Sequence, residues 1–80
     1  MLYILIVELY GEEAQEAIDS YWHGGGKEVF DVLTNYDEGD EGIESSVSAA
    51  GPDDEVMRVG DYNVIVNPED GTAKLEVVVQ

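Results

Sequence analysis

The segment YNVIVNPEDGTAKLEVVV, from Tyr62 to Val79, contains a turn between two stretches of alternating apolar residues. Its centre has Pro68 early and Gly71 where a positive φ is expected, which favours a type I turn that ends in a left-handed glycine. Pairing Asn67 with Thr72 across this turn predicts a β-hairpin. In that register one face carries the larger apolar set, which is Tyr62, Val64, Val66, Ala73, Leu75, Val77 and Val79.

The opposite face of the hairpin is mostly polar. It holds two apolar residues, Ile65 and Val78, beside the polar set Asn63, Thr72, Lys74 and Glu76. A face with alternating apolar residues packs on a core, whereas the other face meets solvent. The hairpin therefore predicts one core face and a thinner exposed apolar spot around Ile65 and Val78.

Further strands are predicted upstream of this hairpin. Residues 2–9 are apolar at both alternating positions, which indicates an interior strand covered on both faces. Residues 27–36 predict a second strand with Phe30, Val32, Thr34 and Tyr36 on one face, and residues 43–49 predict a third. A turn is expected at GPDD (residues 51–54), and Gly60-Asp61 is expected to break the long stretch from Val56 to Asn67.

One helix is predicted, over residues 12–23. Its apolar residues fall at helical spacing and form one stripe, made of Ala14, Ala17, Ile18, Tyr21 and Trp22. Ile18 and Trp22 are expected to lie against the sheet. The whole chain thus predicts a single α+β domain over residues 1–80, in the order β-α-β-β-β-β, with an antiparallel-rich sheet of four to five strands and one helix on one face.

The charge of the chain restricts its partners. With 19 acidic residues against three basic ones, the formal net charge is −16. Such a chain repels nucleic acid and anionic membranes, so a basic protein partner is expected and a monomer is favoured. The chain has no cysteine, which fits a cytoplasmic location, and its apolar start is shorter than the roughly 20 residues of a membrane-spanning helix.

No residue pattern indicates an enzyme, a cofactor or a metal site. In an EF-hand loop starting at Asp37, Gly42 takes the sixth place, but Gly39 and Ser48 stand where oxygen ligands are required. His23 is the only histidine, and no nucleophile is placed beside it by the sequence, so it is expected to cap a helix end. We expect a non-catalytic protein without a tight calcium site.

The acidic residues form three groups that are candidates for partner binding. Side chains on one face of a helix repeat at roughly 5–6 Å, and a DNA strand presents a charge about every 3.4 Å, so rows of carboxylates can occupy a groove built for phosphates. The first group lies on the predicted helix and consists of Glu12, Glu13, Glu16 and Asp19. The second lies in the loop after the second predicted strand and consists of Asp37, Glu38, Asp40, Glu41 and Glu44. The third group is Asp53, Asp54 and Glu55.

In size, absence of cysteine and dense unbalanced acid, the whole chain resembles the small phage-encoded DNA mimics of the anti-CRISPR and anti-restriction type. That resemblance implies an inhibitor that occludes the DNA- or RNA-binding groove of a host defence nuclease complex, such as a CRISPR effector, in the bacterial cytoplasm. Two alternatives stay open, namely a halophile-adapted acidic domain and a regulatory module that docks on another basic protein. Unfolding in low salt would favour the first of these.

Overall fold

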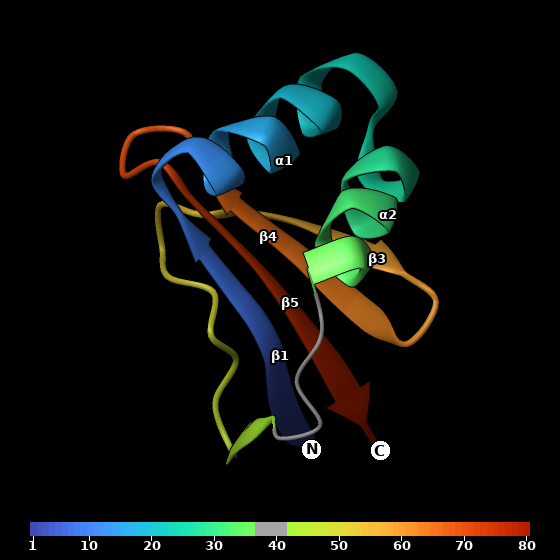
Figure 1. The fold of residues 1–80 in the computed structure, drawn as a ribbon. Coiled ribbons are helices and arrows are strands. Elements are labelled where there is room, and N and C mark those ends of the chain that lie inside the picture. Colours follow the sequence, from blue (N-terminus) through green and yellow to red (C-terminus); the bar gives the residue numbers. More distant parts are fainter. Residues whose placement is uncertain (37–41) are drawn as a thin grey trace.

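Five antiparallel strands form one open sheet, and two helices cover one of its faces (Figure 1). The computed structural model describes residues 1–36 and 42–80. The strand order is β2-β1-β5-β4-β3, so the predicted α+β fold with an antiparallel sheet is confirmed. The elements are β1 (Leu2–Tyr10), α1 (Gly11–Gly24), α2 (Gly26–Tyr36), β2 (Ile43–Ser45), β3 (Glu55–Val59), β4 (Tyr62–Asn67) and β5 (Thr72–Val79).

The β4–β5 hairpin has the predicted register. Asn67 pairs with Thr72 and Val64 pairs with Leu75, while Gly71 has a φ of 66°. The Asn67 side chain fixes the turn, because its Oδ1 accepts hydrogen bonds from the backbone N–H groups of Glu69 and Asp70 at 3.0 and 3.1 Å. The predicted core face is confirmed at its centre, since four of its side chains are buried: Val64, Val66, Ala73 and Leu75.

The predicted break at Gly60-Asp61 is also confirmed, because these two residues connect β3 to β4. Val59 pairs with Tyr62 across the turn. Gly60 has a φ of 62° and the turn contains no other residue with positive φ. Glycine at the first central position is what a type II′ hairpin turn requires.

A β-bulge explains why β1 is apolar at both alternating positions. β1 is an interior strand, as predicted, between β2 and β5. Ile4 pairs with Val77 and Val7 pairs with Leu75, so β1 has one extra residue, Ile6, between the two pairs. A bulge moves the following residues to the other alternating set. Ile4 and Val7 therefore both face the helices, and Leu9 continues this side into the core.

The helix predicted over residues 12–23 is confirmed as α1, but its contact with the sheet is narrower than predicted. Ala14, Ala17 and Ile18 are buried against the core, and Tyr21 packs at its border. Trp22 is 59% exposed, so the expectation that it lies on the sheet is wrong. Its ring instead lies edge-on to Tyr21, with centroids 5.2 Å apart.

Because Trp22 is exposed, Trp22→Ala is expected to lower the free energy of unfolding by less than about 1 kcal/mol. Ile18→Ala, four residues earlier on the same helix, is the matched control and is expected to cost about 2–5 kcal/mol because it opens a cavity in the core. Urea denaturation of both variants tests this difference. Equal losses from the two substitutions would contradict the placement of Trp22.

The prediction of a strand over residues 27–36 is wrong, because this stretch forms α2. The buried residues Gly26, Val29 and Leu33 are spaced i, i+3 and i+7, which is a helical period. The alternation of Phe30, Val32, Thr34 and Tyr36 indicated a strand, but this interpretation placed Val29 and Leu33 on the opposite face, beside Asp31. A Cβ at Gly26 would collide with the Met57 side chain of β3, so glycine lets α2 start close to the sheet.

The third predicted strand, residues 43–49, is also shorter than expected. Only Ile43–Ser45 form a strand, β2, and all three residues are exposed. Residues 46–54, which we call the crossing segment, then run over the face of the sheet opposite the helices, where they contact Glu76 and Lys74. On this face Ile65 is 1% exposed and Val78 is 5% exposed. The predicted exposed apolar spot at these residues therefore does not exist.

Candidate functional site

A fully buried carboxylate holds the crossing segment on the sheet. Glu76 of β5 is 0% exposed. It accepts hydrogen bonds from the Ala49 backbone N–H at 2.8 Å, from Asn63 Nδ2 at 3.0 Å and from the Ser48 hydroxyl. Buried charges persist where hydrogen bonds satisfy their oxygens. Glu76 therefore fixes the path of residues that precede the 51–54 turn.

The predicted turn at residues 51–54 is confirmed, and Asp54 is its organiser. The Asp54 backbone N–H donates to the Gly51 carbonyl at 3.2 Å. In return the Asp54 carboxylate accepts from the Gly51 N–H at 2.6 Å and from Asn67 Nδ2 at 2.8 Å. This last bond ties the crossing segment to the β4–β5 hairpin.

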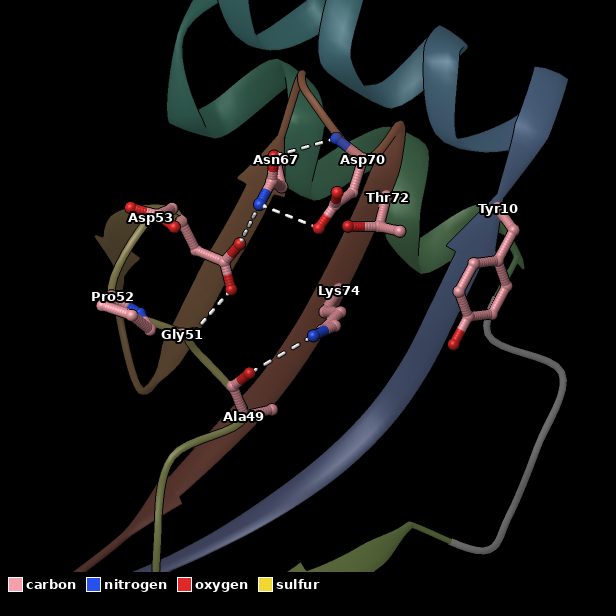
Figure 2. Close-up of a pocket in the computed structure, with 10 residues that line it drawn as sticks. Tyr10, Ala49, Gly51, Pro52, Asp53, Asn67, Asp70, Thr72 and Lys74 are labelled. Atoms are coloured by element: carbon pink, nitrogen blue, oxygen red, sulfur yellow. Dashed lines mark hydrogen bonds between the residues drawn. The ribbon is translucent and has the colours of Figure 1, made fainter.

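These contacts leave a pocket of about 320 Å³ between the crossing segment and the end of the sheet. Figure 2 shows Asn67, Asp70, Thr72 and Lys74 on one side of this pocket and Tyr10 on the far side. The pocket is lined by three carboxylates, those of Asp53, Asp54 and Asp70, and by one ammonium group, that of Lys74. The lining residues are Tyr10, Ala49, Gly51, Pro52, Asp53, Asp54, Asn67, Asp70, Thr72 and Lys74.

The hydrogen bond from Gly51 is the main cause that lowers the pKa of Asp54 below its ordinary value. The Asn67 amide and the charge of Lys74 act in the same direction, whereas partial burial opposes them. Since the folded pKa is below the unfolded one, the folded state favours the ionised carboxylate. The stabilisation is present above the unfolded pKa and is lost as pH falls through the folded pKa.

We therefore expect the effect of Asp54→Asn on stability to depend on pH. The variant should be less stable than the parent at neutral pH, because an amide cannot offer two acceptor oxygens to Gly51 and Asn67. The difference should shrink well below the ordinary aspartate pKa of about 3.9, where the parent carboxyl is itself protonated. Urea melts at both pH values measure this, and an unchanged difference in acid would contradict the assignment.

The helical group of predicted partner-binding residues lies in solvent. Glu12, Glu13, Glu16 and Asp19 are all exposed on α1. Glu16 also has a structural contact, because it accepts a hydrogen bond from the Tyr36 hydroxyl of α2 at 2.7 Å. That bond raises the pKa of Tyr36. The first turn of α1, with Glu12 and Glu13, is the least engaged part of the group.

The other predicted residues are divided by the fold. Asp53 and Asp54 line the pocket. Glu55 pairs with Val66 and so belongs to the helix-facing side, where its buried Oε2 has no hydrogen-bond partner. Glu44 is exposed on β2, paired with Ile4 of β1. Four predicted residues lie outside the described part of the chain, namely Asp37, Glu38, Asp40 and Glu41.

Two acidic residues were missed by the sequence reasoning, Glu69 and Asp70 of the β4–β5 turn. The sequence NPEDGT was interpreted only as a turn. Because the register of the hairpin is known, the position of this turn also determines at which end of the sheet its two carboxylates lie. Figure 1 shows this turn, the 51–54 turn and the start of α1 at the same end of the sheet. We call this surface the acidic end, and it consists of Glu12, Glu13, Asp53, Asp54, Glu69 and Asp70.

Two of the basic side chains bind backbone oxygens. Arg58 Nε donates to the Gly60 carbonyl at 2.6 Å, and Lys74 Nζ donates to the Ala49 carbonyl at 3.3 Å. Of the two, only Lys74 lines the acidic pocket. Within residues 1–36 and 42–80, no three His, Asp or Glu side chains are grouped in a way that could hold a metal ion. His23 Nδ1 donates to the Asp19 carbonyl at 2.8 Å near the end of α1.

The helices described in residues 1–36 and 42–80 are too short or too polar to cross a membrane. No protein-family model matches this sequence, and comparisons with curated proteins and with solved structures give no match either.

Proposed function

We propose that this protein is a non-catalytic acidic inhibitor that binds a basic nucleic-acid-binding protein and occupies its DNA- or RNA-binding groove. Its carboxylates take the place of nucleic-acid phosphates and pair with lysine and arginine of the target. The target class is a nucleoprotein complex of host defence, such as a CRISPR effector, and the place of action is the bacterial cytoplasm.

The acidic end is the observation that carries this proposal. Three segments that are distant in sequence bring six carboxylates to one end of the sheet. Like charges placed together destabilise a fold, and the three segments meet there without an arginine and with Lys74 as the one cation lining the pocket. Such an arrangement is useful where a basic surface neutralises it.

The chemistry of a phosphate groove fits this surface. Arginine binds carboxylates and phosphates with the same planar fork of donors. Carboxylates that lose their water against arginine are expected to contribute about 2–5 kcal/mol each when one is removed, whereas those at the rim mainly change the association rate. A few carboxylates of the acidic end should therefore dominate binding.

The experiment uses pairs of substitutions that change the net charge equally. Asp53→Asn with Asp70→Asn removes charge from the pocket, and Glu12→Gln with Glu13→Gln removes it from the first turn of α1. A third variant neutralises Asp37 and Glu38. The partner is captured from a bacterial lysate with the tagged parent protein, and its affinity for each variant is then measured in dilute and moderate salt.

The matched control is Glu28→Gln with Asp31→Asn, two exposed residues of α2 that are outside all three predicted groups. We expect at least one of the three variants to bind at least about 30-fold more weakly, which corresponds to about 2 kcal/mol, while the control binds like the parent. If all four folded variants bind like the parent in both salts, the phosphate-mimic mechanism is wrong. A parent that unfolds in dilute buffer would favour halophilic acidity.

A further inference from the structure

Within residues 1–36 and 42–80, no further strand pairs with one edge of the sheet along five residues. The strand order ends at β3 on one side and at β2 on the other. β2 has only three residues, whereas β3 runs over Glu55–Val59 and pairs with β4 along its whole length. An edge strand presents unpaired N–H and C=O groups to which another chain can add.

The register identifies these unpaired groups. Val59 and Tyr62 flank the two-residue turn, so the turn's own hydrogen bond joins them. Hydrogen-bonded and non-bonded pairs alternate along an antiparallel ladder. Val59, Met57 and Glu55 are therefore bonded to β4, and the N–H and C=O groups of Val56 and Arg58 point away from the sheet.

β3 is not blocked by proline, by lysine or by a bulge, which commonly protect edge strands, and its pairing with β4 is regular. Its two charged residues are Glu55, on the helix-facing side, and Arg58. The Val56 side chain is exposed on the face opposite the helices. The Arg58 guanidinium is directed back to the Gly60 carbonyl of its own turn.

The charges around β3 select its occupant. Asp53, Asp54 and Glu55 stand at its start and Asp61 follows its end, against one cation within the strand, Arg58. A second copy of the chain brings another charge of −16, and the repulsion between two such chains opposes their pairing. We propose that β3 binds an extended basic segment of the partner, which adds to the sheet as a further strand. This inference rests on the proposed function, since it says how the basic partner is held.

The test uses a capped peptide, RTRVRTR, as the probe. In the free protein, amide exchange measured by NMR should be fast at Val56 and Arg58 and slow at Met57, which is bonded to β4. Adding the peptide should slow exchange at Val56 and Arg58 at least about tenfold, because bonded amides exchange only through opening. The same peptide with N-methylated backbone amides, which has equal charge, should leave both rates unchanged.

A protein variant provides the second arm. Val56→Pro removes an amide that points away from the sheet, where proline is tolerated, and it should weaken peptide binding at least tenfold relative to Val56→Thr. Peptide binding that perturbs only the acidic end and α1, with no slowing at Val56 and Arg58, would overturn strand addition and leave the proposed function standing. Failure of the peptide to bind at all would overturn strand addition as well, whereas the charge-neutralised variants decide on the proposed function independently.

Discussion

Glu76→Ala is expected to lower the free energy of unfolding by about 3–5 kcal/mol, because it leaves three part-buried donors without an acceptor. The Ala49 N–H and the Asn63 amide lose a carboxylate at 2.8 and 3.0 Å, and the Ser48 hydroxyl loses its bond as well. Since these bonds hold the crossing segment on the sheet, the variant should also expose Ile65 and Val78. Urea denaturation measures the stability, and binding of a hydrophobic dye measures the exposure.

Glu76→Gln is the matched control for side-chain volume. Its oxygen still accepts from Asn63 and Ser48, but its amide donor faces the donor of Ala49. We expect a smaller loss than for alanine, about 1–3 kcal/mol, which is the cost of one unsatisfied buried group. A parent-like stability for Glu76→Ala would show that the crossing segment does not depend on this carboxylate.

Leu33→Ala is expected to lower the free energy of unfolding by about 2–5 kcal/mol, because Leu33 is fully buried between α2 and the sheet and alanine leaves a cavity. The neighbouring Thr34→Ala is the control. Thr34 is exposed and its hydroxyl donates to the Asp31 carbonyl of its own helix, so its loss should stay within about 0.5 kcal/mol. If Thr34→Ala were as harmful as Leu33→Ala, the assignment of residues 27–36 to α2, with Thr34 exposed, would be contradicted.

The hairpin could be predicted from the sequence because its information is local. The turn residues from Asn67 to Thr72 fix the register, and the register fixes which side chains share a face. The strand prediction for residues 27–36 was wrong because a short apolar stretch fits the two-residue period of a strand nearly as well as the period of a helix. Val29 and Leu33 are the buried residues that indicate a helix. Their burial depends on a sheet that only later strands complete.

The candidate site was predictable in its composition but not in its arrangement. Asp53 and Asp54 were identified from their charge, whereas Asp70 lines the same pocket because the β4–β5 turn meets the crossing segment, to which Asn67 is bonded through Asp54. The burial of Glu76 could not be predicted from the sequence either, because the sequence pattern is the same for an exposed and for a buried glutamate on the polar face of a strand. What buries Glu76 is the path of the crossing segment, which is fixed by Ser48 and Ala49 more than 25 residues away.

The most direct measurement of the central proposal is a competition between this protein and double-stranded DNA for the partner captured from a lysate. If carboxylates replace phosphates, each ligand should exclude the other from the groove, and the affinity of this protein should fall as salt is added. The proposal predicts binary complexes only, with DNA released as the protein is titrated. A ternary complex of protein, partner and DNA, formed with undiminished affinity for both, would contradict it.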